Sequence, residues 1–245
     1  MGKSVLLTGG TSGIGKAIVK KILAESKDSE DKIFVVYGHS DEAAEALRKE
    51  VGDDSAKLSF IKADLSDYSG IEVVRQAVKK EAESLDWIVL NTGVGTYKKF
   101  DEYTPELWEQ VMRTNVSVPA FIVKEMKEMI NENGAILFMG SHAGQATYSS
   151  SLAYSVSKSA VLFMAKSMVK LFDDKGIRVN AIAPGFIETR WQDGRTDESR
   201  ERINKKIAAH RFGTPGEVAD LCYHVLTNEY LNGSIYDVHG GYDFF

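Results

Sequence analysis

Residues 4–15, with the sequence SVLLTGGTSGIG, decide the fold of this chain. The apolar run at the start does not alternate with polar residues, which is typical of a strand buried on both faces of a parallel sheet. In the turn that follows, Gly9 permits a sharp bend, Gly13 lets the backbone approach a pyrophosphate, and Gly15 lets a helix pack closely. Because this turn directly follows a buried strand, it indicates a dinucleotide-binding unit rather than an ordinary glycine-rich turn.

Strands and helices alternate from this unit to the end of the chain. Buried apolar runs predict strands at 4–8, 32–37, 57–62, 87–91, 135–139, 178–182 and 234–238. Helical periodicity and capping signals predict helices at about 14–25, 41–51, 67–83, 105–131, 152–174 and 215–228. This alternation implies one parallel sheet with helices on both faces. We expect a single α/β domain over residues 1–245, with one charged insertion at about 186–213, at the sheet edge where such folds bind ligands.

The composition excludes several other classes of protein. The 245 residues are 43% hydrophobic, which is enough apolar surface for a sizeable core. The net charge is −5, so neither nucleic acid nor an anionic membrane is an expected partner. No apolar run approaches the length of a membrane span, and the single cysteine, Cys222, excludes an internal disulfide and a cysteine-based zinc cluster. We expect a soluble, cytoplasmic protein without a metal site.

The residues after the second predicted strand bear on the choice of dinucleotide. Such sites usually bind the ribose 2′-hydroxyl through an acidic residue about 20 positions after the glycine motif. That count leads here to residues 35–40, which contain no Asp or Glu. Hydrogen-bond donors stand there instead, with space left by Gly38; they are Tyr37, His39 and Ser40. This favours a 2′-phosphate, and hence NADP. No arginine completes the pattern, so NAD stays open.

Tyr154 and Lys158 form a candidate proton-transfer pair. At a spacing of four, both side chains lie on one face of a predicted helix. A tyrosine with its reference pKa of about 10 exchanges protons poorly at neutral pH, and a neighbouring ammonium lowers that pKa. Such pairs are also common on solvated helix faces. Two further residues favour the functional interpretation: Ser141 directly follows a predicted strand, and Asn115 lies within an apolar helix, where capping or kinking before Pro119 is the alternative role.

Taken in order, these motifs resemble those of the short-chain dehydrogenase/reductase family over nearly the whole chain. The matching positions are residues 8–15, Asp64, residues 91–93, Asn115, Ser141, Tyr154, Lys158 and residues 178–185. The resemblance implies a Rossmann-type, doubly wound fold with a seven-stranded parallel sheet and an NAD(P)-dependent oxidoreductase activity. The pattern is most similar to the 3-oxoacyl-[acyl-carrier-protein] reductase branch of the family.

The resemblance implies a role for each of four catalytic residues. Tyr154 would be the general acid that protonates the reduced carbonyl oxygen, and Ser141 would orient that carbonyl. Lys158 would hold the nicotinamide ribose and lower the pKa of Tyr154, while Asn115 would hold a water that relays protons. The implied cofactor-binding residues are Gly9, Thr11, Ser12, Gly13, Ile14, Gly15, Tyr37, His39, Ser40, Asp64, Leu65, Asn91, Gly93, Tyr154, Lys158, Pro184, Gly185, Ile187 and Thr189.

Two positions depart from the family pattern. Residues 90–93 read LNTG, which keeps one asparagine of the usual NNAG but adds bulk at Thr92. Gly140 stands before Ser141, where a second serine is common. Neither change removes a catalytic atom, but both bear on the pocket wall, so the substrate and the affinity for the cofactor stay open.

Three loops, 94–103, 142–153 and 186–212, are expected to select a small-molecule carbonyl or alcohol substrate. The first choice is a 3-oxoacyl thioester, and a sugar, polyol, steroid or other ketone stays open as the alternative. A third alternative is a non-catalytic dinucleotide-binding module, although such a module has no need for the complete Ser141–Tyr154–Lys158 set. Arg190 and Arg195 would suit an acidic or phosphorylated substrate, but a solvated loop is the simpler interpretation.

The resemblance also implies a homo-oligomer, either a tetramer or a dimer. Family members pair two long helices, which correspond to those predicted here at 105–131 and 152–174. In the second of these, apolar residues lie on more than one face, namely Val161, Leu162, Met164, Ala165 and Met168. The aromatic residues of the C-terminal segment 240–245 would suit a neighbour's pocket.

Overall fold

The sheet has seven strands and is parallel throughout. The computed structural model describes residues 2–96, 98–147 and 151–242. Neighbouring strands follow the order β3-β2-β1-β4-β5-β6-β7, and each pair is parallel. The strands are β1 (Ser4–Thr8), β2 (Lys32–Tyr37), β3 (Leu58–Lys62), β4 (Leu85–Leu90), β5 (Ile130–Met139), β6 (Arg178–Pro184) and β7 (Ile235–Val238). The predicted fold class, a doubly wound α/β domain with a seven-stranded parallel sheet, is confirmed.

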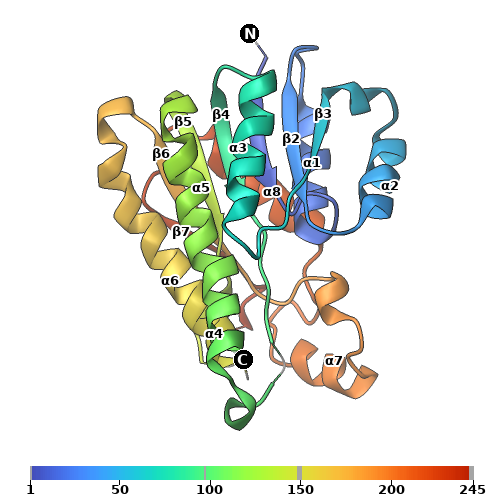
Figure 1. Ribbon diagram of the computed structural model, residues 1–245. Coiled ribbons are helices and arrows are strands. Elements are labelled where there is room, and N and C mark those ends of the chain that lie inside the picture. Colours follow the sequence, from blue (N-terminus) through green and yellow to red (C-terminus); the bar gives the residue numbers. More distant parts are fainter. Residues whose placement is uncertain (1, 97, 148–150, 243–245) are drawn as a thin grey trace.

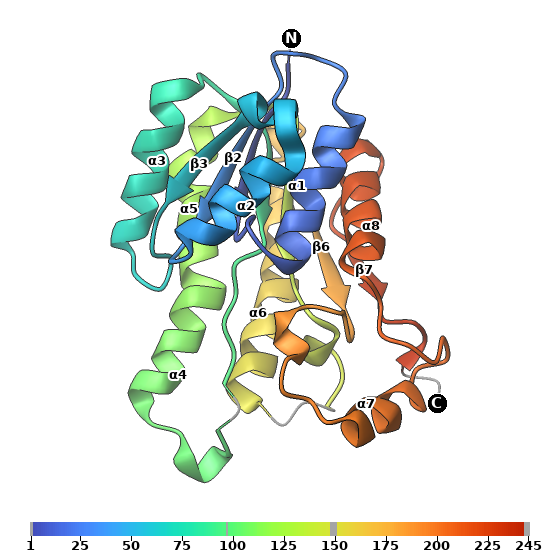
Figure 2. The same ribbon diagram turned by 90° about the vertical axis from the view of Figure 1, so that its right-hand side faces the viewer.

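Helices cover both faces of this sheet (Figures 1 and 2). One face carries α1 (Gly13–Glu25), α2 (Asp41–Val51) and α8 (Pro215–Thr227), and the other carries α3 (Ser69–Glu81), α5 (Val118–Met126) and α6 (Leu152–Met168). Successive strand residues point to opposite faces, so Leu6 packs in the α3–α5–α6 layer and Leu7 in the other. This double burial explains the unbroken apolar runs. Within the described residues, no helix has the length and apolar character to cross a membrane.

The glycine-rich turn lies where the strand order reverses. β1 is flanked by β2 on one side and β4 on the other, so successive crossovers lead away from it in opposite directions. Gly9 and Gly13 have φ angles of 68° and 50°, a region that favours glycine. A Cβ on Gly15 would lie 2.1 Å from the Gly9 carbonyl oxygen. The start of α1 therefore packs against the turn more closely than any side chain permits.

The helix predicted at 105–131 is divided into separate parts. α4 (Pro105–Met112) passes into one turn of π-helix, Arg113–Ser117, and α5 follows it. The prediction was wrong at its C-terminal end, because β5 already begins at Ile130. A π-turn accommodates one extra residue and often marks a functional site. In this chain the π-turn contains Asn115.

Two further elements differ from the prediction. The helix expected at 152–174 ends as an α-helix at Met168 and continues only in short 3₁₀ turns. Within the insertion, where a loop was expected, α7 (Asp197–Asn204) begins at the cap residue Thr196. α7 is strongly polar, and its buried Ile203 packs with Phe212 and Ile207 in a small separate cluster. So little apolar periodicity leaves no helical signal in the sequence.

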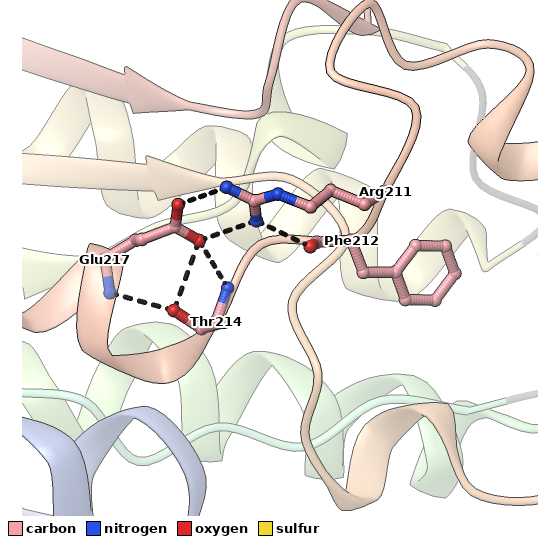
Figure 3. A network of polar contacts seen from close by, with 4 residues as sticks. All are labelled: Arg211, Phe212, Thr214 and Glu217. Atoms are coloured by element: carbon pink, nitrogen blue, oxygen red, sulfur yellow. Dashed lines mark hydrogen bonds and ion pairs between the residues drawn. The ribbon is translucent and has the colours of Figure 1, made fainter.

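A polar network at the start of α8 ends the insertion (Figure 3). The Thr214 Oγ1 accepts the Glu217 N–H at 3.2 Å, and the Glu217 carboxylate accepts the Thr214 N–H at 2.8 Å. The Arg211 guanidinium binds both carboxylate oxygens and also donates to the Phe212 carbonyl at 3.0 Å. This ion pair and the cap together lower the pKa of Glu217 to about 2. The C-terminal end of the insertion is thereby tied to a helix that packs on the sheet.

We expect Gly15→Ala to distort the turn, because the added methyl meets backbone rather than a movable side chain. A loss of about 2 kcal/mol, typical of overpacking, corresponds to a melting temperature lower by about 4–8 °C. Differential scanning calorimetry measures the shift. Gly38→Ala is the matched control, since a Cβ there has no atom within 4 Å. Equal shifts in the two variants would contradict the argument from close packing.

Candidate active site

A cavity of about 640 Å³ lies at the carboxyl ends of the central strands. Most of the predicted site residues line it: Gly9, Ser12, Gly13, Ile14, Asn91, Gly93, Ser141, Tyr154, Lys158, Pro184, Gly185, Ile187 and Thr189. The glycine-rich turn, the proton-transfer pair and the segment after β6 therefore share one space. Residues 148–150, part of one expected substrate loop, lie outside the described residues.

Lys158 is the buried charge of this site. Its side chain is 4% exposed, and its Nζ donates to the Met139 carbonyl oxygen at 2.7 Å. The Nζ atom lies 5.7 Å from the centroid of the Tyr154 ring. Burial lowers the pKa of Lys158 to about 8, since the ammonium has lost most of its hydration. The lysine thus remains a cation at neutral pH, but one that gives up its proton more readily than a lysine in water.

Ser141 lies two residues after the end of β5 and caps a short turn, His142–Gly144, that packs against α6. It is buried, and its Oγ accepts the Ala143 N–H at 3.2 Å. The structure explains the glycine before it, because a Cβ on Gly140 would lie 2.3 Å from the Leu162 Cδ2 atom. The close packing of α6 against the end of β5 therefore requires glycine at that position. With α6 packed in this way, Ser141 lines the cavity.

Asn115 lies behind the cavity rather than in its wall. Its Oδ1 accepts the Val94 N–H at 2.8 Å, and its Nδ2 donates to the Val94 carbonyl at 2.8 Å and to the Ser157 Oγ at 2.9 Å. The amide thus joins the loop after β4 to helix α6. A Cβ on Gly93 would lie 3.2 Å from the Lys158 Nζ and 3.5 Å from the Asn115 Oδ1. The Lys158 ammonium and the Asn115 amide oxygen therefore both lie beside this glycine.

Asn91 uses its side chain to hold the glycine-rich turn. Its Nδ2 donates to the carbonyl oxygens of Thr8 and Gly9 at 3.2 and 3.1 Å. In the other direction, the Thr8 hydroxyl accepts the N–H groups of Asn91 and Thr92 at 3.0 and 3.1 Å. The ends of β1 and β4 are therefore joined by reciprocal bonds. Asn91 shapes the cavity through the turn as well as lining it.

The remaining predicted residues do not line this cavity; they are Thr11, Gly15, Tyr37, His39, Ser40, Asp64, Leu65 and Asn115. Those that follow β2 and β3 lie at the same edge of the sheet. The Tyr37 hydroxyl donates to Asp41 at 2.9 Å, and Ser40 caps α2 by accepting the Ala43 N–H. The Ser66 N–H bond, together with the nearby His39, lowers the pKa of Asp64, so this exposed carboxylate is ionised at neutral pH.

Trp191 is a neighbour of the proton-transfer pair that sequence analysis did not predict. Its ring centroid lies 5.4 Å from that of Tyr154, at an interplanar angle of 42°. A Cβ on Gly95 would lie 2.8 Å from the Trp191 ring and 3.5 Å from the Tyr154 ring. The insertion therefore reaches across the cavity to the tyrosine. The sequence did contain one signal for this role, because Trp191 is a large aromatic residue within a loop that was expected to face the ligand.

A histidine cluster lies beside Ser141. Potential metal-ligating atoms of His142, Asp237 and His239 lie within 4.8 Å of one another. However, the two imidazole rings are stacked with centroids 4.3 Å apart, and the Nδ1 of His239 already accepts the Tyr242 N–H at 3.1 Å. These contacts hold the C-terminal segment against the site, and Tyr242 joins the cavity wall. We therefore assign the cluster to packing rather than to metal binding.

The chain belongs to the short-chain dehydrogenase family, whose model, described as "short chain dehydrogenase", matches residues 3–200. This confirms the predicted family and makes the chain an oxidoreductase of that family. A 3-oxoacyl-[acyl-carrier-protein] reductase of Aquifex aeolicus is 28% identical, covering 98% of this chain and 97% of the relative. Glucose 1-dehydrogenase 2 of Bacillus subtilis is 32% identical, covering 98% of this chain and 94% of the relative. The two relatives carry different substrate names.

Solved structures give the same family. A short-chain dehydrogenase/reductase from Serratia marcescens superimposes with a TM-score of 0.90 at 27% identity, covering 99% of this chain and 98% of that one. BdcA in complex with NADPH gives a TM-score of 0.86 at 27% identity, covering 98% of this chain and 94% of that one. A blue fluorescent protein from a metagenomic library, also in complex with NADPH, gives 0.89 at 26% identity, with 98% of each chain covered.

We expect Lys158→Met to stabilise the cofactor-free protein at pH 7 by about 1–3 kcal/mol, because the variant removes a desolvated charge. The pKa of Lys158 is lower in the folded state than in the unfolded state. The penalty is therefore complete below about pH 8 and disappears as the pH rises toward the unfolded value. Chemical denaturation at pH 7 and pH 10 should show the gain shrinking. Lys166→Met, at an exposed position of α6, is the control; a gain that grows with pH would contradict the argument.

Proposed function

We propose that the protein reduces a carbonyl group with NADPH and that the substrate is a 3-oxoacyl thioester. The observation that carries the proposal is that Ser141, Tyr154 and Lys158 share one cavity with the glycine-rich turn. The named activity of the Aquifex aeolicus relative supports the substrate. The two neighbours solved with NADPH support the cofactor.

The residues at the turn fit a dinucleotide. The first turn of α1 carries no acidic residue, and the cap residue Ser12 makes no side-chain bond there, so the positive end of the helix meets an anion without a competing carboxylate. Gly93 leaves space directly beside the Lys158 ammonium. We assign the adenosine half to the edge formed by Asp64, Leu65 and the residues 37–40. When bound, the cofactor supplies the hydride.

The protein's part in the reaction is to orient the carbonyl and supply a proton. The Ser141 hydroxyl donates to the carbonyl oxygen, and the Tyr154 hydroxyl protonates that oxygen as the alcohol forms. The Lys158 ammonium, which lies over the same ring, stabilises the phenolate that remains. Because Asn115 joins the loop at Val94 to Ser157 behind the lysine, it holds the route by which Tyr154 and Lys158 regain a proton.

The insertion serves as the substrate-selecting cover of this site. Ten of its residues between Phe186 and Lys206 line the cavity, and Trp191 packs against Tyr154. The capping network at Thr214 anchors its C-terminal end (Figure 3). In the chain, the cover thus lies between β6, a strand of the sheet, and α8, a helix that packs on it.

The direct test follows the absorbance of NADPH, and in parallel NADH, while acetoacetyl-CoA is added. We expect NADPH to be oxidised, and Tyr154→Phe to lower kcat by about 10²–10⁴-fold, because the proton donor is lost while the ring remains. A fluorescence titration should give the same NADPH affinity for both proteins. Oxidation that survives in the variant would overturn the role of Tyr154. Reduction of NADP⁺ by glucose in a second assay, without oxidation of NADPH by acetoacetyl-CoA, would favour the activity named for the Bacillus subtilis relative.

We also propose that two copies pair through the outer face of α6. Leu152, Val156 and Phe163 are exposed and recur at spacings of four and seven, which places them in one stripe. Phe163 is 73% exposed, and Phe121 of the neighbouring α5 is exposed as well. Exposed apolar stripes of this kind mark protein interfaces.

Sedimentation velocity at micromolar concentration should therefore show an oligomer, and Phe163→Glu should shift it to the monomer, since a charge would be buried at the contact. Tyr230→Glu is the control, because Tyr230 is 95% exposed and lies outside both helices. A monomeric protein at these concentrations would exclude the pairing.

A further inference from the structure

Besides Arg190, which lies near the glycine-rich turn, three cationic side chains of the insertion line the cavity. They are Arg195, Arg202 and Lys206, and the last two lie four positions apart at the end of α7 and directly after it. Among the described residues that line this cavity, none is an Asp or a Glu. The wall formed by the insertion is therefore positively charged, with no carboxylate of the lining to balance it.

The neighbouring cations of the same insertion are balanced. Arg200 pairs with Glu188, and Lys205 pairs with Glu201 at 2.8 Å. Arg202 and Lys206 have no such ion pair with any described carboxylate, although both lie on the same short segment. Arg200 and Lys205, which do not line the cavity, thus have carboxylate partners, whereas the two cations of this segment that line it have none among the described residues.

Arg195 is held in position by neutral groups. Its Nε donates to the Gln192 Oε1 at 2.6 Å, and its guanidinium lies 5.5 Å from the centroid of the Phe186 ring. Gln192 is buried, so this hydrogen bond fixes the guanidinium at the cavity wall. The contacts orient the positive charge without neutralising it. An oriented guanidinium is well suited to a carboxylate or a phosphate group.

The phosphates of the dinucleotide do not account for this wall. They belong at the glycine-rich turn, where Arg190 lines both the cavity and an adjoining hollow next to Gly13. Figures 1 and 2 both show α7 apart from the start of α1. Arg202 and Lys206 therefore face the part of the cavity that the insertion covers, where the substrate lies.

We infer that this cation wall, made of Arg195, Arg202 and Lys206, binds an anionic group of the substrate, either a carboxylate or a phosphate. The inference rests on the proposed function, because it concerns the substrate of the same site. Several cations at the wall of one cavity repel each other, and a bound anion reduces that repulsion. The wall therefore selects charged ketones over uncharged ketones of similar size.

Binding can be measured without turnover in the complex with NADP⁺, which has no hydride to give. Isothermal titration compares two pairs of ligands: acetoacetate with ethyl acetoacetate, and acetoacetyl-CoA with the acetoacetyl thioester of N-acetylcysteamine. We expect the charged member of at least one pair to bind about tenfold more tightly or better, and that preference to fall with rising salt. Preference in the first pair identifies a carboxylate, and preference in the second identifies the phosphates of the carrier.

Arg202→Gln and Lys206→Gln should each remove most of this preference, whereas Lys205→Gln, which does not line the cavity, should leave it unchanged. The affinity for NADPH should be the same in all four proteins. Equal affinities within both pairs would overturn the inference. A loss of NADPH binding in the two cavity variants, with the ligand preference intact, would also overturn it, because the cations would then serve the cofactor. Failure of the proposed function is seen separately, as binding of these ligands without any oxidation of NADPH in the activity assay.

Discussion

The Asn91 side-chain amide donates to the carbonyl oxygens of Thr8 and Gly9, and the Thr8 hydroxyl accepts two N–H groups in return. This reciprocal clamp brings the ends of β1 and β4 together at the reversal of the strand order. The positive φ at Gly9 and the closeness of Gly15 to its carbonyl oxygen are tolerated because both residues lack a Cβ. With the turn fixed, the start of α1 faces the space between the strands, and the loop after Asn91 is directed toward α6.

The same loop couples the clamp to the buried ammonium. Beyond Gly93, the backbone of Val94 is held at both its N–H and its carbonyl by Asn115, which the π-turn directs toward Ser157 on α6. A regular α-helix would rotate the asparagine to another face. Lys158, beside this coupling, is buried, and burial lowers its pKa to about 8. Burial of the Lys158 ammonium therefore has two effects: it lowers the stability of the folded chain, and it makes the lysine give up its proton more readily.

The parts of this architecture that sequence predicts are those encoded locally. Unbroken apolar runs identify the strands because each strand is buried on both faces, and the glycine spacing identifies the turn because each glycine meets a backbone constraint within a few residues. Features that depend on contacts between residues far apart in the sequence cannot be predicted in this way. The π-turn exists because Asn115 reaches Val94 and Ser157, and Gly140 is needed because Leu162 packs over it. No periodicity in the sequence records either contact.

The insertion illustrates a third case, in which the composition is visible but its arrangement is not. Its charges alternate along the sequence, so a solvated loop is the natural interpretation. The structure separates them: Arg200 and Lys205 pair with carboxylates and do not line the cavity, while Arg202, Ile203 and Lys206 line it. One short helix, capped at its start and packed through a single isoleucine, is enough to sort the charges onto two faces. The net charge of such a segment therefore says little about its role. Its side chains that line the cavity are cationic or neutral, whereas its carboxylates lie elsewhere on the segment.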